Sequence, residues 1–554
     1  MPTLKDSPKV IQNPNPAVPL AALVQFDAAE AIRRTQIRVT DGDKTRDLSF
    51  DDSYDPTQGL PLLCMYEGRA HEISVEIELR DGSRSGPYHL TYVTPMLPRD
   101  SLEYPTIEIK ECVPDALEPG YTFMTLWRRC PKRPMWMTKK QADFFRKWGM
   151  IICIDPAGKI VWSYQTDKQL QGIVRLPNGN IFYHTEWFQS VEIDMLGNEV
   201  RKFHATARLG EDVPGSVGIN AASIHHMPHH MSNGNFLCLT AHAREIENYP
   251  ASETDPNVRA TKNVIGDAIV EFTPNGDIVW EWNAFDHLDP FRIGYNFTNY
   301  YWHVRGFPHH YDWTHGNGVC HDPHDDTIMV SFRHQCAVLK IDRKTKEIIW
   351  ILGTHDNWGP EYQSKLLTPV GDDFEWHWHG HNPRVTGPNT FVMYDNHILQ
   401  AMPFKERKNP GACFARAVEY EVDRDAMTVR QVWTSRDTEE TRVLSWAMGD
   451  AHRLPKTDNM LVIDSGCTVT DDPIAESGEV RQEDLIWDNF NRSAFIVSDF
   501  PPWVRMRELR RSDTADVLWE AHIKHPHEII GWEVFGGFRA ASLYPEGVES
   551  LGAA

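Results

Sequence analysis

The sequence is poor in long apolar runs. No segment reaches the roughly 18–20 consecutive apolar residues that a membrane-spanning helix requires. The first residues, Met1–Pro8, are polar, and the apolar segment Ala17–Phe26 is short, is interrupted by Pro19 and lacks a clear cleavage site. Because no export signal is visible, the sequence predicts a cytoplasmic protein without a membrane partner, or a periplasmic one if a leader has been removed.

Cysteine and positive charge are also scarce. The nine cysteines are odd in number and scattered, which indicates reduced thiols rather than a disulfide framework. Only 56 lysines and arginines stand against 78 aspartates and glutamates, and the formal net charge is −22. This charge disfavours nucleic acid as a partner, although it is compatible with a local cationic pocket. The basic run Arg505–Arg511 is predicted to be a solvated face.

Helical periodicity is rare, and the common nucleotide motifs are missing. The best helix candidate is Met137–Trp148, whose lysines and arginines share one side. No P-loop, dinucleotide-binding fingerprint or Ser-His-Asp nucleophile motif occurs. Any chemistry must therefore come from other residues.

Short strand pairs joined by tight turns recur from about residue 150 onward. One type closes on Trp and covers Ile154–Trp162, Phe272–Trp280, Ile341–Trp350 and Val422–Trp433. A second type alternates with it and covers Leu176–Tyr183, Met231–Cys238, Gly387–Met393 and Leu454–Val462, with Asp325–Val330 as a further copy. Two such hairpins make a four-stranded unit, and units of this size close radially into a propeller. We therefore predict an all-β chain with a six-bladed β-propeller; a pair of β-sandwiches is the alternative.

The region before the repeats has a different pattern. Residues 1–115 carry short alternating runs separated by Asp-Gly and Asp-Asp turns, which predict a small N-terminal β-sandwich-like domain. Residues 116–554 are assigned to the six-bladed β-propeller. Two long insertions, at about 241–264 and 283–313, are predicted to lie as loops on one face.

The 26 histidines gather ahead of three hairpins. Counting nine residues back from Asn235 and from Thr390 gives His226 and His381, which are equivalent points of two units. His315 also lies just ahead of a hairpin strand. Because the inner strands of a propeller line a central channel, these matching residues are expected to converge there.

A guanidinium is expected to join the histidines. The turn at Asp325–Asp326 folds the chain back, so Arg333 returns to the level of His315 and Asn317. Such a group suits a small oxyanion, because an arginine forms charge-assisted hydrogen bonds with sulfuryl or phosphoryl oxygens.

Two chemistries use a cluster of this kind. Convergent imidazoles could bind Zn, Fe or Cu, and the ligands would then be His226, His315 and His381. Alternatively, one histidine acts as nucleophile while arginine and the other imidazoles stabilise charge on a tetrahedral group. Arg333 favours the second chemistry, because a permanent cation among the ligands weakens the binding of a divalent metal.

Several segments resemble the bacterial PAPS-independent arylsulfate sulfotransferases. The most specific parts are the spacing from His315 to Arg333 and the segment Trp280–Pro290. The resemblance covers most of the chain and extends to Asn15–Ala21, Gly380–His381 with its hairpin, and Phe538–Tyr544. It implies a small N-terminal β domain, a six-bladed propeller with its active site on the central channel, and ping-pong sulfuryl transfer through a sulfohistidine.

The resemblance also implies roles for single residues. His381 matches the nucleophile that attacks sulfur. The predicted catalytic residues are His381, His315, Arg333 and His226, and the predicted substrate-binding residues are Asn317, His225 and His379. The implied partners are a small aromatic sulfate and a phenol, without a cofactor; a bound metal stays open, and the chain could form a homodimer.

Two other functions compete with this interpretation. The first is a metal-dependent lyase, hydrolase or oxygenase that acts on an aromatic substrate through the same histidines. The second is a propeller that serves only as an interaction platform. The aromatic residues Tyr300, Tyr301, Trp302, Trp376 and Trp378 could form a sleeve for a phenolic substrate, or pack inside the sheets.

Overall fold

The computed structural model describes residues 4–42, 44–129, 138–185, 188–299, 301–302, 305–408, 412–468, 501–524 and 530–550. In these ranges nearly every element is a β-strand, and almost all strand pairs are antiparallel, so the prediction of an all-β chain is confirmed. None of the eight cysteines in the described ranges forms a disulfide. Across the same ranges, no helix has the length and apolar character needed to cross a membrane.

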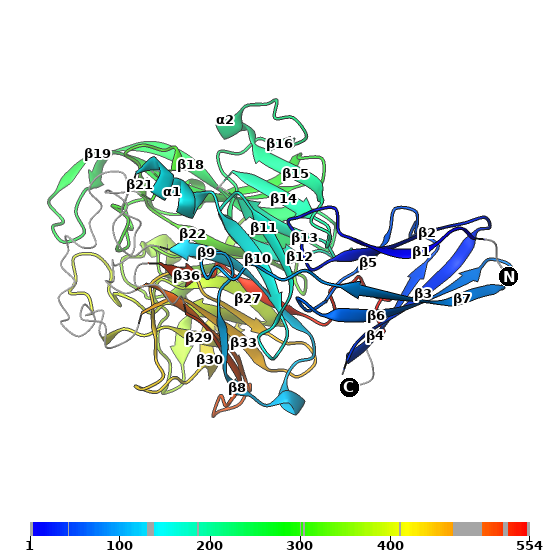
Figure 1. Cartoon of the computed structure of the whole chain (residues 1–554). Coiled ribbons are helices and arrows are strands. Elements are labelled where there is room, and N and C mark those ends of the chain that lie inside the picture. The colour runs from blue at the N-terminus through cyan, green and yellow to red at the C-terminus, as the bar shows by residue number, and fades with distance from the viewer. Residues whose placement is uncertain are drawn as a thin grey trace.

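The N-terminal part contains two sheets (Figure 1). One consists of β1 (Leu4–Gln12), β2 (Ala22–Ala28) and β5 (Leu60–Leu62), and the other of β4 (Lys44–Asp51), β3 (Ile32–Asp41), β6 (Ala70–Leu79) and β7 (Arg84–Val93). Side chains of β3 and β6 alternate between buried and exposed, as expected of strands with one face on a core. The two sheets contribute Val24, Val39 and Val75 to one hydrophobic cluster, and they extend away from the larger body.

Six further sheets of the described residues form the larger body. The first contains β9 (Tyr121–Arg129), β10 (Gly149–Ile154), β11 (Ile160–Thr166), β36 (Gly531–Glu533) and β37 (Gly537–Ala540). The second contains β12 (Leu170–Arg175), β13 (Ile181–Thr185), β14 (Gln189–Ile193), β15 (Glu199–Ala205) and β16 (Val217–Ile219). The third contains β17 (His225–His230), β18 (Phe236–Pro250), β19 (Arg259–Phe272), β20 (Ile278–Asn283) and β21 (Tyr311–Asp312).

The remaining sheets follow in chain order. The fourth contains β22 (Gly316–Asp322), β23 (Thr327–Phe332), β24 (Ala337–Asp342) and β25 (Ile348–Gly353). The fifth contains β26 (Thr368–Val370), β27 (His381–Gly387), β28 (Thr390–Asp395), β29 (Arg416–Asp423) and β30 (Thr428–Thr434). The sixth contains β31 (Leu444–Ser445), β32 (Asp450–Arg453), β33 (Met460–Thr468), β34 (Trp503–Leu509), β35 (Val517–Ile523) and β8 (Ile107–Cys112). Short helices are α1 (Lys139–Arg146), α2 (Thr206–Leu209), α3 (Ala284–His287), η1 (Pro114–Ala116) and η4 (Pro360–Lys365).

The hairpins predicted from the repeats are all present. Each predicted strand pair is an antiparallel ladder in the structure. The turn asparagines explain part of this repetition. Asn180, Asn235 and Asn459 each donate a side-chain hydrogen bond to a buried glutamate of the same sheet, at 2.6–2.7 Å. Each turn is therefore fixed to its own sheet by a buried, charge-assisted contact.

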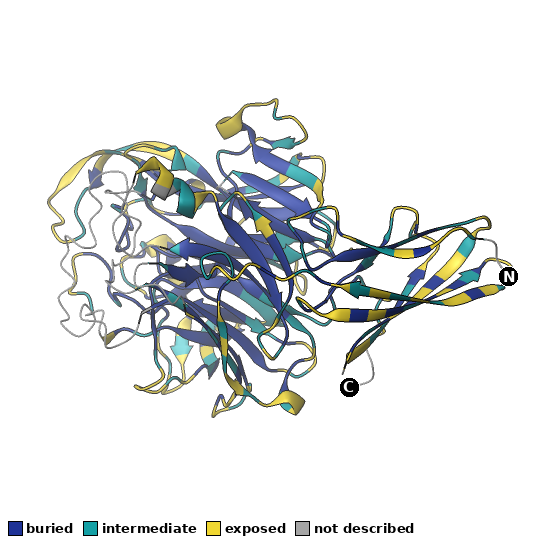
Figure 2. Cartoon of the chain, viewed as in Figure 1, coloured by how far each residue is buried: buried dark blue, intermediate teal, exposed yellow. Residues whose placement is uncertain are grey.

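The first strands of successive sheets lie against one another. β12 contacts β17, β17 contacts β22, β22 contacts β27, and β27 contacts β32; β37 contacts β12 and β33. Figure 2 shows the strands of the larger body, such as β22, as largely buried, in contrast to the striped pattern of the N-terminal sheets. The beginnings of the inner strands are therefore brought to one central region of the larger body.

Strands from distant parts of the chain complete two of these sheets. β8 pairs with β35, and both β36 and β37 pair with β9. β8 precedes residue 115, so a strand from the predicted N-terminal domain lies in the sixth sheet of the larger body. The domain boundary stays a prediction.

The insertion predicted as a loop at 241–264 is instead mostly a hairpin, and only residues 251–258 at its tip lie outside the strands. β18 and β19 continue their ladder from Phe236↔Phe272 out to Pro250↔Arg259. The outer end of this long hairpin is anchored by Tyr249, which is buried and contacts the rings of Phe297 and Tyr311. The prediction was wrong because those aromatic partners lie in the second insertion, which consists mostly of turns and the short α3. The helix predicted at Met137–Trp148 corresponds to α1.

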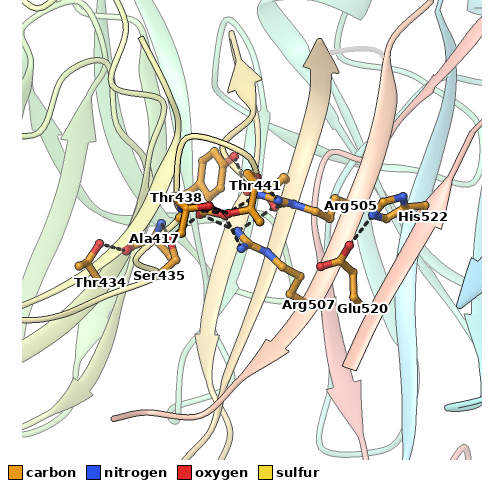
Figure 3. A network of polar contacts seen from close by, with 12 residues as sticks. Ala417, Thr434, Ser435, Thr438, Thr441, Arg505, Arg507, Glu520 and His522 are labelled. Atoms are coloured by element: carbon orange, nitrogen blue, oxygen red, sulfur yellow. Dashed lines mark hydrogen bonds and ion pairs between the residues drawn. The ribbon is translucent and has the colours of Figure 1, made fainter. Parts of the chain in front are cut away.

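The basic run Arg505–Arg511, predicted as a solvated face, is buried at its first two arginines and exposed at Arg510. Arg505 and Arg507 are only 3% and 2% exposed, and they lie side by side on β34 toward the Thr438–Thr441 segment (Figure 3). Arg507 donates to both carboxylate oxygens of Asp437, at 2.7 and 3.1 Å, and Arg505 donates to Asp464 at 2.7 Å. The partners come from a preceding strand and loop, which local charge patterning does not reveal.

Candidate active site

Three of the predicted histidines meet at the beginnings of the inner strands. His226 lies on β17, His315 immediately precedes β22, and His381 begins β27. The ring centroids of His226 and His315 are 5.4 Å apart, and those of His226 and His381 are 6.3 Å apart. The convergence predicted for these side chains is therefore present, and all three are buried.

Irregular backbone turns these side chains toward one another. His226 and His315 have φ values of 65° and 47°, a left-handed conformation that is uncommon for a residue with a side chain. The strand ladders shift register at the same places, between His225 and His229 on β17 and between His381 and Arg384 on β27. Such bulges re-aim side chains and are frequent next to active sites.

Close packing of β22 against β27 needs a glycine. A Cβ on Gly318 would lie 2.4 Å from the Cα of Asn382, so no other residue fits there without movement of the backbone. Asn317, the preceding residue, donates from Nδ2 to the carbonyl of Gly380 at 2.8 Å and accepts a hydrogen bond from Ser331. In this arrangement Asn317 holds the backbone next to His381; its predicted contact with a substrate stays a prediction.

The hydrogen bonds of His381 define its tautomer. Nδ1 lies 2.7 Å from the carbonyl oxygen of Gly449, and because a carbonyl only accepts, Nδ1 carries the proton. Burial lowers the pKa of His381 to about 4. The ring is therefore neutral near pH 7, with its lone pair on Nε2, and Nε2 has no hydrogen-bond partner among the described residues.

His225 and His226 form a connected pair. Their Nδ1 atoms are 2.6 Å apart, and Nε2 of His225 is 3.3 Å from a carboxyl oxygen of Asp267. One of the two Nδ1 atoms donates the proton of the contact between them, and the other accepts it. Burial, followed by the neighbouring histidines, lowers the pKa of His226 well below its ordinary value.

His315 is held by an aspartate that the sequence pattern did not single out. Nδ1 of His315 lies 2.5 Å from Oδ2 of Asp312, which is buried. The ring of Tyr301 lies against His315, with centroids 4.4 Å apart. Burial and then the charge of Arg333 lower the pKa of His315 well below its ordinary value.

Arg333 returns to the level of His315 as predicted from the hairpin. Its backbone N–H donates to the carbonyl of His315 at 3.1 Å, and Nη2 donates to the carbonyl of Trp446 at 2.6 Å. Nη1 is buried and has no partner in the described residues. Burial lowers the pKa of Arg333 to about 10, so the guanidinium stays charged near pH 7 and retains an unused donor.

Two further histidines near Arg333 also carry unpaired nitrogens. Both ring nitrogens of His379 are buried and lack a partner in the described part of the chain, as does Nε2 of His334. The His334 ring centroid lies 4.7 Å from that of His315 and 6.3 Å from that of His379. Because an unpaired buried polar group destabilises a fold, such a concentration indicates a place where a ligand completes the hydrogen bonds.

The aromatic residues predicted to form a sleeve are divided. Tyr301 and Trp302 lie at the site, where Trp302 contacts His225 with ring centroids 5.2 Å apart. Trp376 instead packs against Phe374. Tyr300 lies outside the described residues.

The metal alternative has a different set of candidate ligands. Among the described residues, the group whose ligand atoms lie within 4.8 Å of one another is Asp312, His315 and His334, whereas the predicted set was His226, His315 and His381. Nδ1 of His315 and Nδ1 of His334 are already engaged by Oδ2 and the carbonyl oxygen of Asp312. Arg333 adds positive charge beside both rings, which opposes the binding of a divalent cation.

Several residues of this centre were missed by the sequence prediction, although a signal for two of them existed. Counting nine residues back from Asn180 and Asn459, as was done for the histidines, gives Gln171 and Asp450. Gln171 accepts a hydrogen bond from the backbone of His226 at 2.6 Å, and Asp450 accepts one from Asn382 at 2.8 Å. Phe535, whose ring centroid lies 5.7 Å from that of His381, had no such signal.

The fold and site together define an all-β protein with neutral imidazoles and a buried guanidinium at the centre of its sheets. The sequence model of the arylsulfotransferase (ASST) family matches residues 123–491, which is most of the chain and contains every predicted site residue. The chain belongs to the arylsulfotransferase family.

The similarity to individual relatives is confined to a smaller part. The arylsulfate sulfotransferase AssT of Escherichia coli O6:H1 strain CFT073 is 32% identical over 143 residues, which are 22% of this chain and 22% of that protein. AssT of Lelliottia amnigena is 29% identical over 138 residues, again 22% of each chain. The matched region thus spans about a fifth of the length of these curated relatives.

Likeness to solved structures is weak. A mutant of the apocarotenoid oxygenase of Synechocystis has a TM-score of 0.33 and 9% identity, and the match covers 77% of this chain and 95% of that one. At this TM-score the likeness supports no conclusion about this chain.

Proposed function

We propose that the protein is an arylsulfate sulfotransferase that moves a sulfuryl group from an aryl sulfate to a phenolic acceptor in two steps. The observation that carries the proposal is the state of His381. Its Nδ1–H is committed to the Gly449 carbonyl, its pKa is lowered to about 4 by burial, and its unprotonated Nε2 lies among the central histidines. A neutral imidazole with an exposed lone pair is a competent nucleophile at pH 7.

In the first step Nε2 of His381 attacks sulfur, the bond from sulfur to the aryl oxygen breaks, and a phenolate leaves. In the second step the oxygen of an acceptor phenol attacks the sulfur of the sulfohistidine, and the bond to Nε2 breaks. The donor supplies the sulfuryl group itself, so no diffusible nucleotide takes part. Arg333 offsets charge on the sulfuryl oxygens through its unused Nη1 donor.

We further propose that the six sheets of the larger body are blades of one propeller around this site. The contacts from β12 through β17, β22 and β27 to β32, and the contact of β37 with β12, support a ring of inner strands. In such a ring the first residues of each inner strand surround one axis. His226, His315, His381, Gln171 and Asp450 occupy these positions.

A metal-dependent reaction is the second candidate, because Asp312, His315 and His334 are close enough to share an ion. The hydrogen bonds within the group and the adjacent guanidinium weigh against it. Its prediction is a stoichiometric metal that survives gel filtration and an activity that chelators remove.

The test uses p-nitrophenyl sulfate with the purified protein, with and without phenol, and measures metal content on the same sample. The expected result is acceptor-dependent release of nitrophenolate by metal-free protein, together with a sulfuryl adduct on the His381 peptide after acid-free quenching and mass spectrometry. His381→Asn should form no adduct. Undiminished activity in His381→Asn, without an adduct in the unmodified protein, contradicts the proposal.

Two substitutions serve as controls for this experiment. His324→Asn removes a histidine at the far end of the β22–β23 hairpin, where it pairs with Asp322, and should leave the adduct unchanged. About one tightly held metal per chain with no release of nitrophenolate would instead support the metal-dependent candidate.

A further inference from the structure

The buried carboxyl group of Asp312 is surrounded by donors. Oδ1 accepts from Nε1 of Trp302 at 2.9 Å. Oδ2 accepts from Nδ2 of Asn299 at 3.3 Å and lies 2.5 Å from Nδ1 of His315. Indole and amide N–H groups donate only, so these contacts suit a carboxylate, and a carboxylate at Nδ1 holds the proton of His315 there.

The backbone on both sides of His315 is fixed by a second aspartate. Oδ2 of Asp267 accepts from the hydroxyl of Thr314 and, at 2.6 Å, from the backbone N–H of Gly316. The ring of His315 is thus set by Asp312, while the strained backbone that carries it is set by Asp267. The result is one orientation in which Nε2, rather than Nδ1, is the nitrogen available for proton transfer.

The position of His315 suits proton transfer at the oxygen of the substrate. Its ring contacts both Tyr301 and His226, and His226 in turn lies beside His381. A leaving phenolate oxygen becomes strongly basic as its bond to sulfur breaks, unless its ring withdraws charge. A positioned acid lowers the barrier for such a leaving group, and the same group acts as base on the acceptor in the reverse direction.

We propose that Asp312 is a positioning residue that makes His315 the acid and base of sulfuryl transfer; this inference rests on the proposed function. The first step takes place in the protonated form of His315, which is the minor form near pH 7 because burial and Arg333 lower the pKa of His315. In this step the proton on Nε2 moves to the aryl oxygen while the bond from sulfur to that oxygen breaks, and a phenol leaves. In the second step the O–H proton of the acceptor moves to Nε2 of His315 while its oxygen attacks sulfur. The carboxylate of Asp312 stabilises the imidazolium that is present before the first step and after the second, and it keeps its own negative charge.

The test compares two donors that differ only in the basicity of the leaving group. Phenyl sulfate releases a strongly basic phenolate that needs a proton, whereas p-nitrophenyl sulfate releases a weakly basic nitrophenolate. Single-turnover release of each phenol is followed by quenched flow without acceptor, so that only the first step is observed. In Asp312→Asn the amide can force the opposite tautomer on His315, and release of phenol should slow by about 10²-fold or more. Release of nitrophenolate should slow by less than about tenfold, because no proton is required.

Two further variants make this test specific. His315→Gln is measured in parallel and should show the same difference between the two donors. Asp322→Asn is the matched control, because Asp322 is also buried and hydrogen-bonded to a histidine, His324, at the other end of the same hairpin. It should leave both rates within about twofold of the unmodified protein.

The possible failures are distinguishable. Absence of release from either donor by the unmodified protein contradicts the proposed function. Release from both donors that slows equally in Asp312→Asn, or the absence of a donor-dependent difference in His315→Gln, contradicts the positioning role while leaving sulfuryl transfer in place. The comparison of the two donors in His315→Gln still tests the role of His315 as acid and base if Asp312→Asn does not fold.

Discussion

Two buried clusters of charged residues in this protein differ in how fully they are paired. In the cluster of Arg505 and Arg507, the guanidiniums contact Asp437 and Asp464, and within the described residues only Nε of Arg507 lacks a partner. In the central cluster, nitrogens of Arg333, His334 and His379 have no partner there. Both clusters are removed from water, so burial alone does not explain the difference.

The pKa directions follow the pairing. Burial alone would lower the pKa of Arg505, yet Asp464 and Asp437 raise it above its ordinary value. Burial lowers the pKa of Arg333 to about 10, and the opposing effects of Cys336 and Asp312 do not restore the ordinary value. The first cluster stabilises the fold, whereas the second keeps donors unused at a cost to stability. Such a cost is typical of sites that bind a charged ligand.

The largest expected effect comes from breaking the paired cluster. Asp464→Asn leaves two buried guanidiniums with less compensating charge, and we expect the free energy of unfolding to fall by about 4 kcal/mol. Thermal unfolding measures the change, and the specific activity of the folded protein should not alter. Asp47→Asn is the control, because its pair with Arg38 is exposed, and it should not shift the unfolding temperature. Equal shifts of the unfolding temperature in Asp464→Asn and Asp47→Asn would contradict the larger contribution of the buried cluster.

Removing the guanidinium of Arg333 should reduce activity without reducing stability, the opposite of the result expected for Asp464→Asn. Arg333→Met eliminates a buried charge that has one hydrogen bond from its side chain, to Trp446, so stability should be unchanged or higher. Sulfuryl transfer should slow by about 10²-fold, because a donor to the sulfuryl oxygens is lost. Initial rates with p-nitrophenyl sulfate and thermal unfolding on the same preparation check both parts. A loss of stability as large as that of Asp464→Asn would show that Arg333 stabilises the fold, as Arg505 and Arg507 do, and would contradict this prediction.

Acid should destabilise the fold through its buried neutral histidines. Burial lowers the pKa of His334 to about 3, from an ordinary value of 6.5, so the unfolded chain binds the proton first. The stability contributed by the neutral ring is complete above pH 6.5 and is lost as the pH falls toward 3. Between pH 7 and pH 5 the loss from one such histidine is about 2 kcal/mol.

The variant His334→Gln isolates this contribution. Its amide can still donate to the carbonyl of Asp312, and it does not titrate. The difference in unfolding free energy between pH 7 and pH 5 should be about 2 kcal/mol smaller in the variant than in the unmodified protein. The aspartates with lowered pKa, such as Asp395, do not interfere because they stay ionised at pH 5. Parallel pH profiles for the two proteins would be the contrary result.

The smallest expected effect is a gain of stability. His379→Leu replaces a buried ring, both of whose nitrogens lack partners, with an apolar side chain of smaller size. We expect stability to rise by about 1 kcal/mol because the desolvation cost disappears. If His379 binds substrate, the KM for the aryl sulfate should rise at the same time. A fall in stability with an unchanged KM would assign His379 to packing.

The fold was predictable from the sequence to the extent that its signals are local. The turn-and-strand repeats gave the hairpins because each turn asparagine, such as Asn235, is fixed within its own sheet by a buried glutamate. The long hairpin at 241–264 was mistaken for a loop because Tyr249 depends on partners far along the chain. For the same reason Arg505 and Arg507 were predicted to be solvated: the aspartates that pair with them lie far from them in the sequence.

The site was predictable at the positions that follow the repeat. His226 and His381 came from a fixed count to the turn, and the same count points to Gln171 and Asp450. Asp312 could not be found in this way. It precedes His315 by three residues, and it contacts the ring of His315 because the left-handed backbone at His315 turns that ring back toward it. A repeat in the sequence identifies equivalent positions in the fold. A contact that depends on one residue with irregular backbone leaves no such repeat, so the sequence pattern does not reveal it.

The strands that complete two of the sheets have a consequence for how the protein is made. β8 must wait for β35, and β9 remains an open edge until β36 and β37 have been synthesised. On the ribosome, the early hairpins can form as they emerge, and β9 can pair with β10. The other edge of β9 is available to any other strand during the whole of that time. The exposed edge of β9 is therefore covered only when β36 and β37, among the last strands to be synthesised, pair with it. The central histidines acquire their full surroundings, including Phe535, only at that moment.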